Sequence, residues 1–260
     1  MTTEKDPELM AAITAYADRL TCLAALMLSS QVASREDHHR IFLLAQGVRV
    51  FRAFQAVRLL TKAGFNDAAG GVLRTLIEQA FVMCAIAKDA NLMSVLVDQL
   101  LAEKHKAFSG LLKLEAAERP DFLTPDRIMA AMEESKKGSG FNAHFWAEKC
   151  DLVHVYHTLY RRLCTFAHGS MGGVSEYMKV DASGAVTSIM GDVQVSVENY
   201  VLTAASIVQD AVKLIVADDA EPELIQRLED LSKEQLDLFD RWCKSEDLIT
   251  SVDEIDLSSS

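Results

Sequence analysis

The sequence lacks the signals that would direct it into a membrane or out of the cell. No uninterrupted apolar run approaches the roughly 20 residues that a membrane-spanning helix needs. The N-terminal stretch MTTEKDPELM is acidic, whereas a secretion signal is basic and then apolar. We therefore expect a cytoplasmic protein without a membrane partner.

Paired cysteines and nucleotide-binding loops are missing as well. The five cysteines stand singly, with no C-x-x-C pair, which suits a reducing compartment and argues against a disulfide framework or a zinc ribbon. The sequence has no G-x4-G-K-[ST] loop, no glycine-rich nucleotide fingerprint and no serine nucleophile elbow. We expect no bound cofactor.

The chain has fewer basic than acidic residues, and most of the excess of acidic residues lies in one segment. The net charge is −12, and residues 218–260 alone carry 14 acids and 4 bases. The first 217 residues are therefore almost neutral. A near-neutral body does not exclude a polyanionic ligand, although it exerts no strong attraction.

The abundant feature is helical periodicity in a chain that is half apolar, enough for a sizeable core. It predicts an all-α fold, a bundle of about seven to eight helices, with a small β-hairpin near residues 177–190 around Asp181-Ala-Ser-Gly184. We divide the chain into a helical domain, 1–217, and an acidic C-terminal helix with a flexible tail, 218–260. The expected helices are 8–30, 37–62, 66–89, 90–117, a shorter one from 125, 145–169, 192–216 and one from about 222.

The segment 151–170, DLVHVYHTLYRRLCTFAHGS, predicts the end of a long amphipathic helix with two unlike faces. The apolar face consists of Leu152, Tyr156, Leu159, Leu163 and Phe166. The opposite face consists of His154, His157, Arg161, Cys164 and His168. A metal ion cannot collect these histidines and the cysteine, because the last two lie roughly 10 Å or more from the first two along the helix. We expect no metal site.

At the end of this helix, Arg161 and Arg162 precede His168 by seven and six positions. The pattern Arg162 to His168, followed by Gly169, resembles the R-x4-6-H motif of HEPN domains, an all-helical superfamily that includes RNA-cleaving toxins and defence proteins. The resemblance implies metal-independent RNA cleavage in a homodimer, with His168 as acid or base and Arg162 or Arg161 stabilising the phosphate. The alternative is a helix end at which positive charge is favourable without catalysis.

A second motif, Arg74-Thr-Leu-Ile-Glu78, places an arginine and a glutamate on one helix face among apolar neighbours. Together with the sequence Ala-His-Gly-Ser that ends at Ser170, it resembles a bacterial family of helical proteins of unknown function, over residues 42–178. We expect Arg74 and Glu78 to face His168 across a polar pocket, where Glu78 orients the imidazole or Arg162. Tyr160 and Ser170 are the further supporting residues. The alternative is a buried pair with a purely structural role.

Between Asp37 and Asp67 the sequence has no acid, and its basic residues form the best candidate RNA-binding surface. These residues are Arg49, Arg52, Arg58 and Lys62. The acidic final helix and tail could instead lie against this face.

Two functions remain open from the sequence. The first is an HEPN-like ribonuclease, a toxin or defence effector whose partners are RNA, a second copy of the chain, and an antitoxin or other protein. The second is a catalytically inactive helical module that binds a small ligand or a partner protein in the same pocket.

Overall fold

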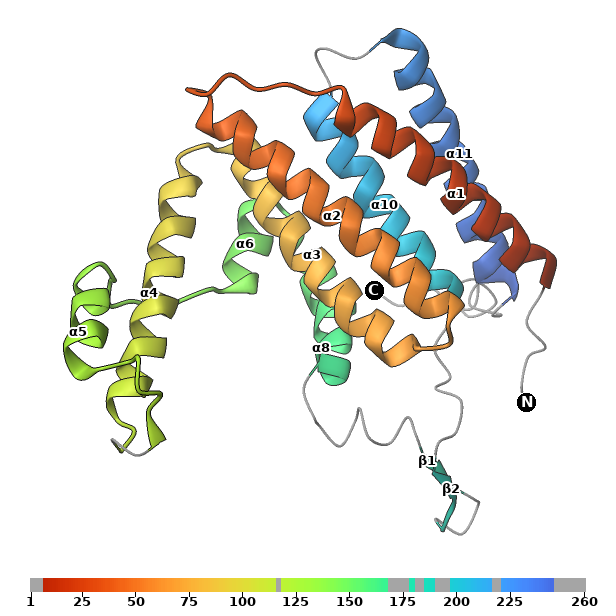
Figure 1. Cartoon of the computed structure of the whole chain (residues 1–260). Helices are drawn as coiled ribbons and strands as arrows, with labels where there is room; N and C mark the ends of the chain where they lie inside the picture. Colours follow the sequence, from red (N-terminus) through yellow and green to blue (C-terminus); the bar gives the residue numbers. More distant parts are fainter. Residues whose placement is uncertain are drawn as a thin grey trace, which may run out of the picture.

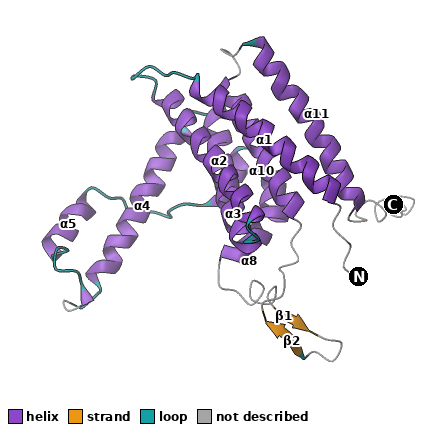
Figure 2. Ribbon diagram, turned by 45° about the vertical axis from the view of Figure 1, so that its right-hand side comes forward, coloured by secondary structure: helices purple, strands orange, loops and turns teal. Residues whose placement is uncertain are grey.

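The structure is a computed structural model that describes residues 7–115, 118–167, 178–180, 185–189, 197–216 and 221–245. These residues are helical apart from two short strands and the connecting turns, so the all-helical bundle is confirmed (Figure 2). Nine helices result when α7, η2 and α8 are counted as one. The helices are α1 (Pro7–Ser29), α2 (His38–Lys62), α3 (Asn66–Lys88), α4 (Leu92–Leu112), α5 (Pro125–Glu133), α6 (Ala143–Lys149), α7 (Val153–Val155), the π-helix η2 (Tyr156–Tyr160), α8 (Arg161–Ala167), α10 (Val197–Val216) and α11 (Pro222–Ser245).

The core lies where α10 packs against α1, α2, α3 and α11 (Figure 1). Ile215 on α10 approaches α2 so closely that a Cβ added to Gly47 would lie 2.1 Å from its Cδ1 atom. Glycine at this position therefore permits the close contact between the two helices. The helix α11 joins the same core through Leu228, Leu231 and Leu238, which are all buried.

Three of the described helices, α1, α3 and α10, are long and apolar enough to cross a membrane by length and composition alone. In the fold their apolar side chains pack together, and Ile13, Leu76 and Leu202 are fully buried. The cytoplasmic location stays a prediction.

The helices α4 and α5 form an arm that projects from the bundle (Figure 1). A buried hydrogen bond ties α4 to α6, in which Trp146 Nε1 donates to Gln99 Oε1 at 2.8 Å. The loop before α6 is fixed by Asn142, whose side chain accepts from the backbone N–H of Phe145 and caps the helix.

The long helix expected from 145 to 169 is interrupted. It stops at Lys149, passes through Asp151 with φ of 63°, and resumes at Val153. Aspartate tolerates this left-handed conformation better than most residues. Lys88 on α3 stabilises the break, because its ammonium donates to the Cys150 carbonyl at 3.0 Å and to Asp151 Oδ2 at 2.9 Å.

Two strands, β1 (Met178–Val180) and β2 (Val186–Ile189), pair antiparallel, with Met178 opposite Ile189. The segment between them, 181–184, lies outside the described residues. The hairpin expected near 177–190 therefore stays a prediction.

Candidate functional site

A polar cluster joins α3 to the helix that carries the two arginines. Arg74 Nη2 lies 3.0 Å from Glu78 Oε1, and the same nitrogen donates to the Tyr160 hydroxyl at 2.9 Å. Tyr160 in turn donates to Glu78 Oε1 at 2.6 Å, and Arg74 Nε donates to Cys164 Sγ at 3.2 Å. The Arg74 and Glu78 side chains are only 20% and 19% exposed. We call these four residues the Arg74 cluster.

The π-helix η2 brings Tyr160 into this cluster. Its turn is closed by the N–H of Arg161, which bonds to the carbonyl of Tyr156 five residues earlier, where an α-helix would use four. The extra residue turns Tyr160 toward α3, although the expected apolar stripe passed through Leu159 instead. The Tyr160 ring is buried, stacks on Tyr156 at 5.1 Å, and lies 5.1 Å from the Arg74 guanidinium carbon.

Tyr160 and Arg74 hold their protons more firmly than usual. Burial, the hydrogen bond to Glu78 and the charge of Glu78 raise the pKa of Tyr160 above its ordinary value. Burial alone would lower the pKa of Arg74. The hydrogen bond to Cys164 and the negative charge of Glu78 have the opposite and larger effect, so the pKa of Arg74 is raised. Tyr160 therefore acts as a hydrogen-bond donor near neutral pH. These properties suit the positioning of a helix better than the transfer of a proton.

The other predicted site residues lie at or beyond the end of this helix. Arg161 and Arg162 are the first two residues of α8, and both side chains are exposed. His168 and Ser170 lie outside the described residues, so their roles stay predictions. The structure connects Glu78 with Arg74 and Tyr160.

Cys164 is the member of the cluster that the sequence did not reveal, because it was assigned to the histidine stripe. The four-residue spacing between Tyr160 and Cys164 is the sequence signal that could have assigned Cys164 to the cluster. Residues four apart share a helix face, so a side chain that reaches Tyr160 can also reach Cys164. The partner Arg74 lies 90 residues earlier in the chain, and no local pattern predicts that contact.

Two histidines of the expected stripe lie within the described residues, and neither is a member of this cluster. His154 and His157 are exposed, and the His157 ring lies 5.7 Å from that of His144. No group of three histidine, cysteine or acidic side chains that could hold a metal ion is found in the described part of the chain.

The four basic residues of α2 that were predicted to bind RNA have different surroundings in the structure. Arg49 Nη1 donates to Gln46 Oε1 at 3.3 Å, Arg52 is exposed, and Arg58 and Lys62 line a cavity against α1. The acidic helix α11 packs on α1 and α10, where Glu234 pairs with Arg19 of α1. The described part of the acidic segment therefore covers α1, and the tail lies outside the described residues.

A cavity of about 360 Å³ opens on the far side of the Arg74 cluster, between α2, α3 and α4. Its walls include Phe42, Arg49, Glu78 and Gln79. The Gln79 side-chain oxygen is buried and accepts no hydrogen bond within the described structure. We call this space the Glu78 cavity, because Glu78 belongs to both the cavity and the cluster.

A second cluster of titratable groups lies where α3 meets α6. The Cys150 thiol is within hydrogen-bonding reach of Cys84 and lowers the pKa of the Cys84 thiol to about 7, an effect that burial opposes and the charge of Lys88 assists. The hydrogen bond to Cys84 and burial raise the pKa of Cys150 well above its ordinary value. Cys84 is the more acidic thiol of the pair.

We expect Cys84 to react with iodoacetamide at a rate that reaches half its maximum near pH 7, because the thiolate is the nucleophile. Peptide mass spectrometry over a range of pH measures this midpoint. Lys88→Gln and Cys150→Ala should raise it, since each removes a group that stabilises the thiolate. Lys104→Gln, which changes a partly buried lysine on α4 that pairs with Glu134, should leave the midpoint unchanged. A midpoint equal to that of the urea-unfolded chain would contradict the expectation.

Comparison with known proteins yields a family without an assigned activity. No curated protein matches the chain, and no solved structure matches it. A family model does match, over residues 41–185, and this range contains the Arg74 cluster, the Glu78 cavity and the predicted residues Arg161 to Ser170. It agrees closely with the range over which the Arg74 to Glu78 motif resembles a helical family of unknown function. Because the match covers more than half of the chain, the protein belongs to the family of unknown function DUF5677.

Proposed function

We propose that the protein is a metal-independent endoribonuclease of the HEPN type, a toxin or defence effector that acts as a cytoplasmic homodimer. His168 serves as acid or base, and Arg162, with Arg161, stabilises the negative charge on the phosphate. The proposal rests on the resemblance of Arg162 to His168 to the superfamily motif. One structural observation supports it. The Arg74 cluster anchors the inner face of the helix whose outer face presents both arginines.

The chemistry requires few groups. The ribose 2′-oxygen loses its proton to a base and attacks phosphorus, while the bond to the 5′-oxygen breaks and that oxygen takes a proton from an acid. The products are a 2′,3′-cyclic phosphate and a 5′-hydroxyl. An imidazole titrates near neutral pH and suits the proton transfers, and a permanently charged guanidinium suits the phosphorane-like transition state. Pairing of two protomers would supply a second imidazole for the opposite role.

Anchoring of the helix matters because such catalysis depends on position. A guanidinium that must meet a developing charge loses much of its effect when its helix can shift by about 1 Å. Two hydrogen bonds from Arg74 and one from Tyr160 hold α3 and the helix together at a partly buried site. In this proposal Arg74, Glu78 and Tyr160 are positioning residues. The RNA backbone would contact four basic residues of α2, which are Arg49, Arg52, Arg58 and Lys62.

The test is incubation of the purified protein with total RNA in the presence of EDTA. We expect fragments with 2′,3′-cyclic phosphate ends from the unaltered chain, and no such fragments from His168→Ala or Arg162→Ala. The control is Arg241→Ala, which removes an exposed arginine from α11. Circular dichroism should show that all variants keep their helical content; Arg162 and Arg241 are exposed, so their removal should not disturb the fold.

An inactive protein requires one further experiment, because an acidic tail could block the site. The shortened chain should end after Ser245, since α11 contributes Leu228, Leu231 and Leu238 to the core. Absence of cleavage by both the full and the shortened chain would refute the nuclease proposal.

A second candidate function is favoured by the Glu78 cavity. Its volume of about 360 Å³ lies within the range for small-molecule sites, and its walls combine apolar side chains with Arg49, Glu78 and the unpaired Gln79 oxygen. In this alternative the chain is a catalytically inactive module that binds a small ligand or a partner protein. Ligand-dependent thermal stabilisation that Glu78→Gln removes, together with inactivity on RNA, would favour it.

A further inference from the structure

A larger cavity, apart from the Arg74 cluster, lies between α1, α2 and α10, near the turn from α2 into α3. It has a volume of about 760 Å³ and is open to solvent. This volume is in the range of sites that hold small organic molecules. We call it the Arg58 cavity. Its walls include none of the proposed catalytic or positioning residues, although Arg58 and Lys62 also belong to the proposed RNA-binding surface.

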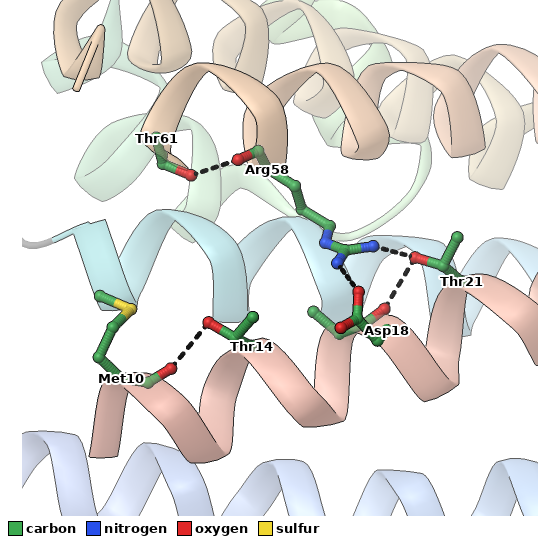
Figure 3. Close-up of polar contacts among 7 residues, drawn as sticks. Met10, Thr14, Asp18, Thr21, Arg58 and Thr61 are labelled. Carbon is green, nitrogen blue, oxygen red and sulfur yellow. Dashed lines mark hydrogen bonds and ion pairs between the residues drawn. The ribbon is translucent and has the colours of Figure 1, made fainter. Parts of the chain in front are cut away.

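One wall of the Arg58 cavity is a polar bridge between two helices (Figure 3). The Arg58 side chain extends from α2 to α1, where its guanidinium donates to the Asp18 carboxylate and to the Thr21 hydroxyl. The hydroxyls of Thr14 and Thr61 donate to carbonyls of their own helices, to Met10 at 2.8 Å and to Arg58 at 3.0 Å. These groups are already satisfied and give the wall a fixed geometry.

Two other groups of the cavity lack partners in the described part of the chain. The Asn66 side-chain oxygen is buried and accepts no hydrogen bond. Lys62 is exposed at the rim and forms no ion pair with any described residue. A buried acceptor without a donor is energetically unfavourable, so such atoms are uncommon unless another molecule supplies the donor.

The charges and apolar surfaces of the cavity define what would fit. Arg58 and Lys62 carry two positive charges against the single negative charge of Asp18. The N-terminus of α3 begins at Asn66 without a side-chain cap and adds partial positive charge. The lining also includes apolar side chains, among them Ile13 and Val201. The cavity therefore combines positive charge with apolar surface, which suits a ligand that has both an acidic group and an apolar body.

We propose that the Arg58 cavity binds a small amphipathic organic anion. Its acidic group lies at Lys62, an N–H or O–H group donates to the Asn66 oxygen, and its apolar body lies between α1 and α10. The binding uses none of the residues proposed to catalyse RNA cleavage or to position the arginines, but it shares Arg58 and Lys62 with the proposed RNA-binding surface.

The probe is 8-anilinonaphthalene-1-sulfonate, which combines a sulfonate, an N–H donor and an apolar ring system. We expect saturable binding with one site per chain, measured by the rise in fluorescence and by calorimetry. The probe should also raise the midpoint of thermal unfolding, because a ligand of the native state stabilises that state. A fall in the midpoint would show binding to unfolded chains and would overturn the proposal.

Two pairs of variants locate the site. Lys62→Glu should weaken binding about tenfold or more, whereas Arg52→Glu, the same charge change at an exposed position of α2 outside the cavity, should change it by less than about twofold. Thr14→Trp should abolish binding by filling the cavity, whereas Ala15→Trp, the adjacent exposed position on α1, should not. Both members of each pair change exposed residues, so the fold should survive.

The uncharged analogue N-phenyl-1-naphthylamine separates the contribution of charge from that of the apolar body. Its affinity should fall with Thr14→Trp and be unaffected by Lys62→Glu. Equal effects of Lys62→Glu and Arg52→Glu on the sulfonate would show non-specific attraction to a basic helix and refute the proposal. Equal effects of Thr14→Trp and Ala15→Trp would place the probe elsewhere and refute it too.

Discussion

Replacing Trp146 with alanine is expected to lower the free energy of unfolding by about 3 to 5 kcal/mol, the range for removal of a large buried aromatic side chain. Trp146 is fully buried in the core, and its indole N–H donates to Gln99, which is also buried. The change creates a cavity and leaves the Gln99 oxygen without a donor. Urea unfolding followed by circular dichroism measures the loss.

Two companion variants separate the two causes. Trp146→Phe keeps much of the ring but removes the donor, so it should cost less, about 1 to 3 kcal/mol. The double variant Trp146→Phe with Gln99→Leu should recover part of that loss, because no buried acceptor is then left unpaired. A loss below about 1 kcal/mol for Trp146→Ala would contradict the fully buried position, since even smaller core deletions usually cost more.

Replacing Arg74 with alanine is expected to cost about 2 to 3 kcal/mol. Breaking a fully buried ion pair costs about 3 to 5 kcal/mol, but Arg74 and Glu78 keep about one fifth of their side-chain surface in water, which reduces the loss. The change leaves Glu78 with only the Tyr160 hydroxyl, removes the donor to Cys164, and removes the guanidinium that lies over the Tyr160 ring. Urea unfolding measures this loss as well.

Control variants test whether geometry or charge alone stabilises the cluster. Arg74→Lys keeps the charge but cannot reach Glu78, Tyr160 and Cys164 from one planar group, so its loss should be intermediate. Arg161→Ala, at an exposed position, should change stability by less than about 0.5 kcal/mol. Equal losses for Arg74→Ala and Arg161→Ala would show that the cluster does not stabilise the fold.

The long helices could be predicted closely from the sequence because their end signals are local. The second helix was expected to begin at Asp37; it begins at His38, and the Asp37 carboxylate accepts from the Arg40 N–H as its N-cap. Thr124 and Pro125 start α5 in the same manner, with the Thr124 hydroxyl accepting from Arg127. In these cases the residues that set the helix end are near neighbours in the chain.

The break at Asp151 and the π-turn before Arg161 could not be predicted, because distant residues stabilise them. Apolar side chains recur through both positions without proline or glycine, so the pattern indicates one unbroken helix. Lys88, about 60 residues earlier, holds the break. Arg74 and Glu78 lie more than 80 residues before the tyrosine that the π-turn directs toward them.

The contacts within the candidate site were predictable only where they are local in the sequence. The Arg74 to Glu78 pair was expected from its spacing and apolar surroundings, and the structure contains it. The contact with Tyr160 depends on the π-turn, and the contact with Cys164 depends on that turn as well. The sequence therefore indicated the pair and named Tyr160 as a supporting residue, but it did not indicate Cys164.

The π-turn changes what a deletion does at this position. Five residues complete the turn from Tyr156 to Arg161, where an α-helix would use four. Loss of one residue between Tyr156 and Tyr160 would therefore convert this turn to an α-turn and leave α7 and α8 in nearly the same relative orientation, with the contacts of α8 to α3 retained. Family members that lack one residue here are expected to keep the Arg74 cluster, whereas loss of a residue within α8 would rotate the later side chains by about 100°.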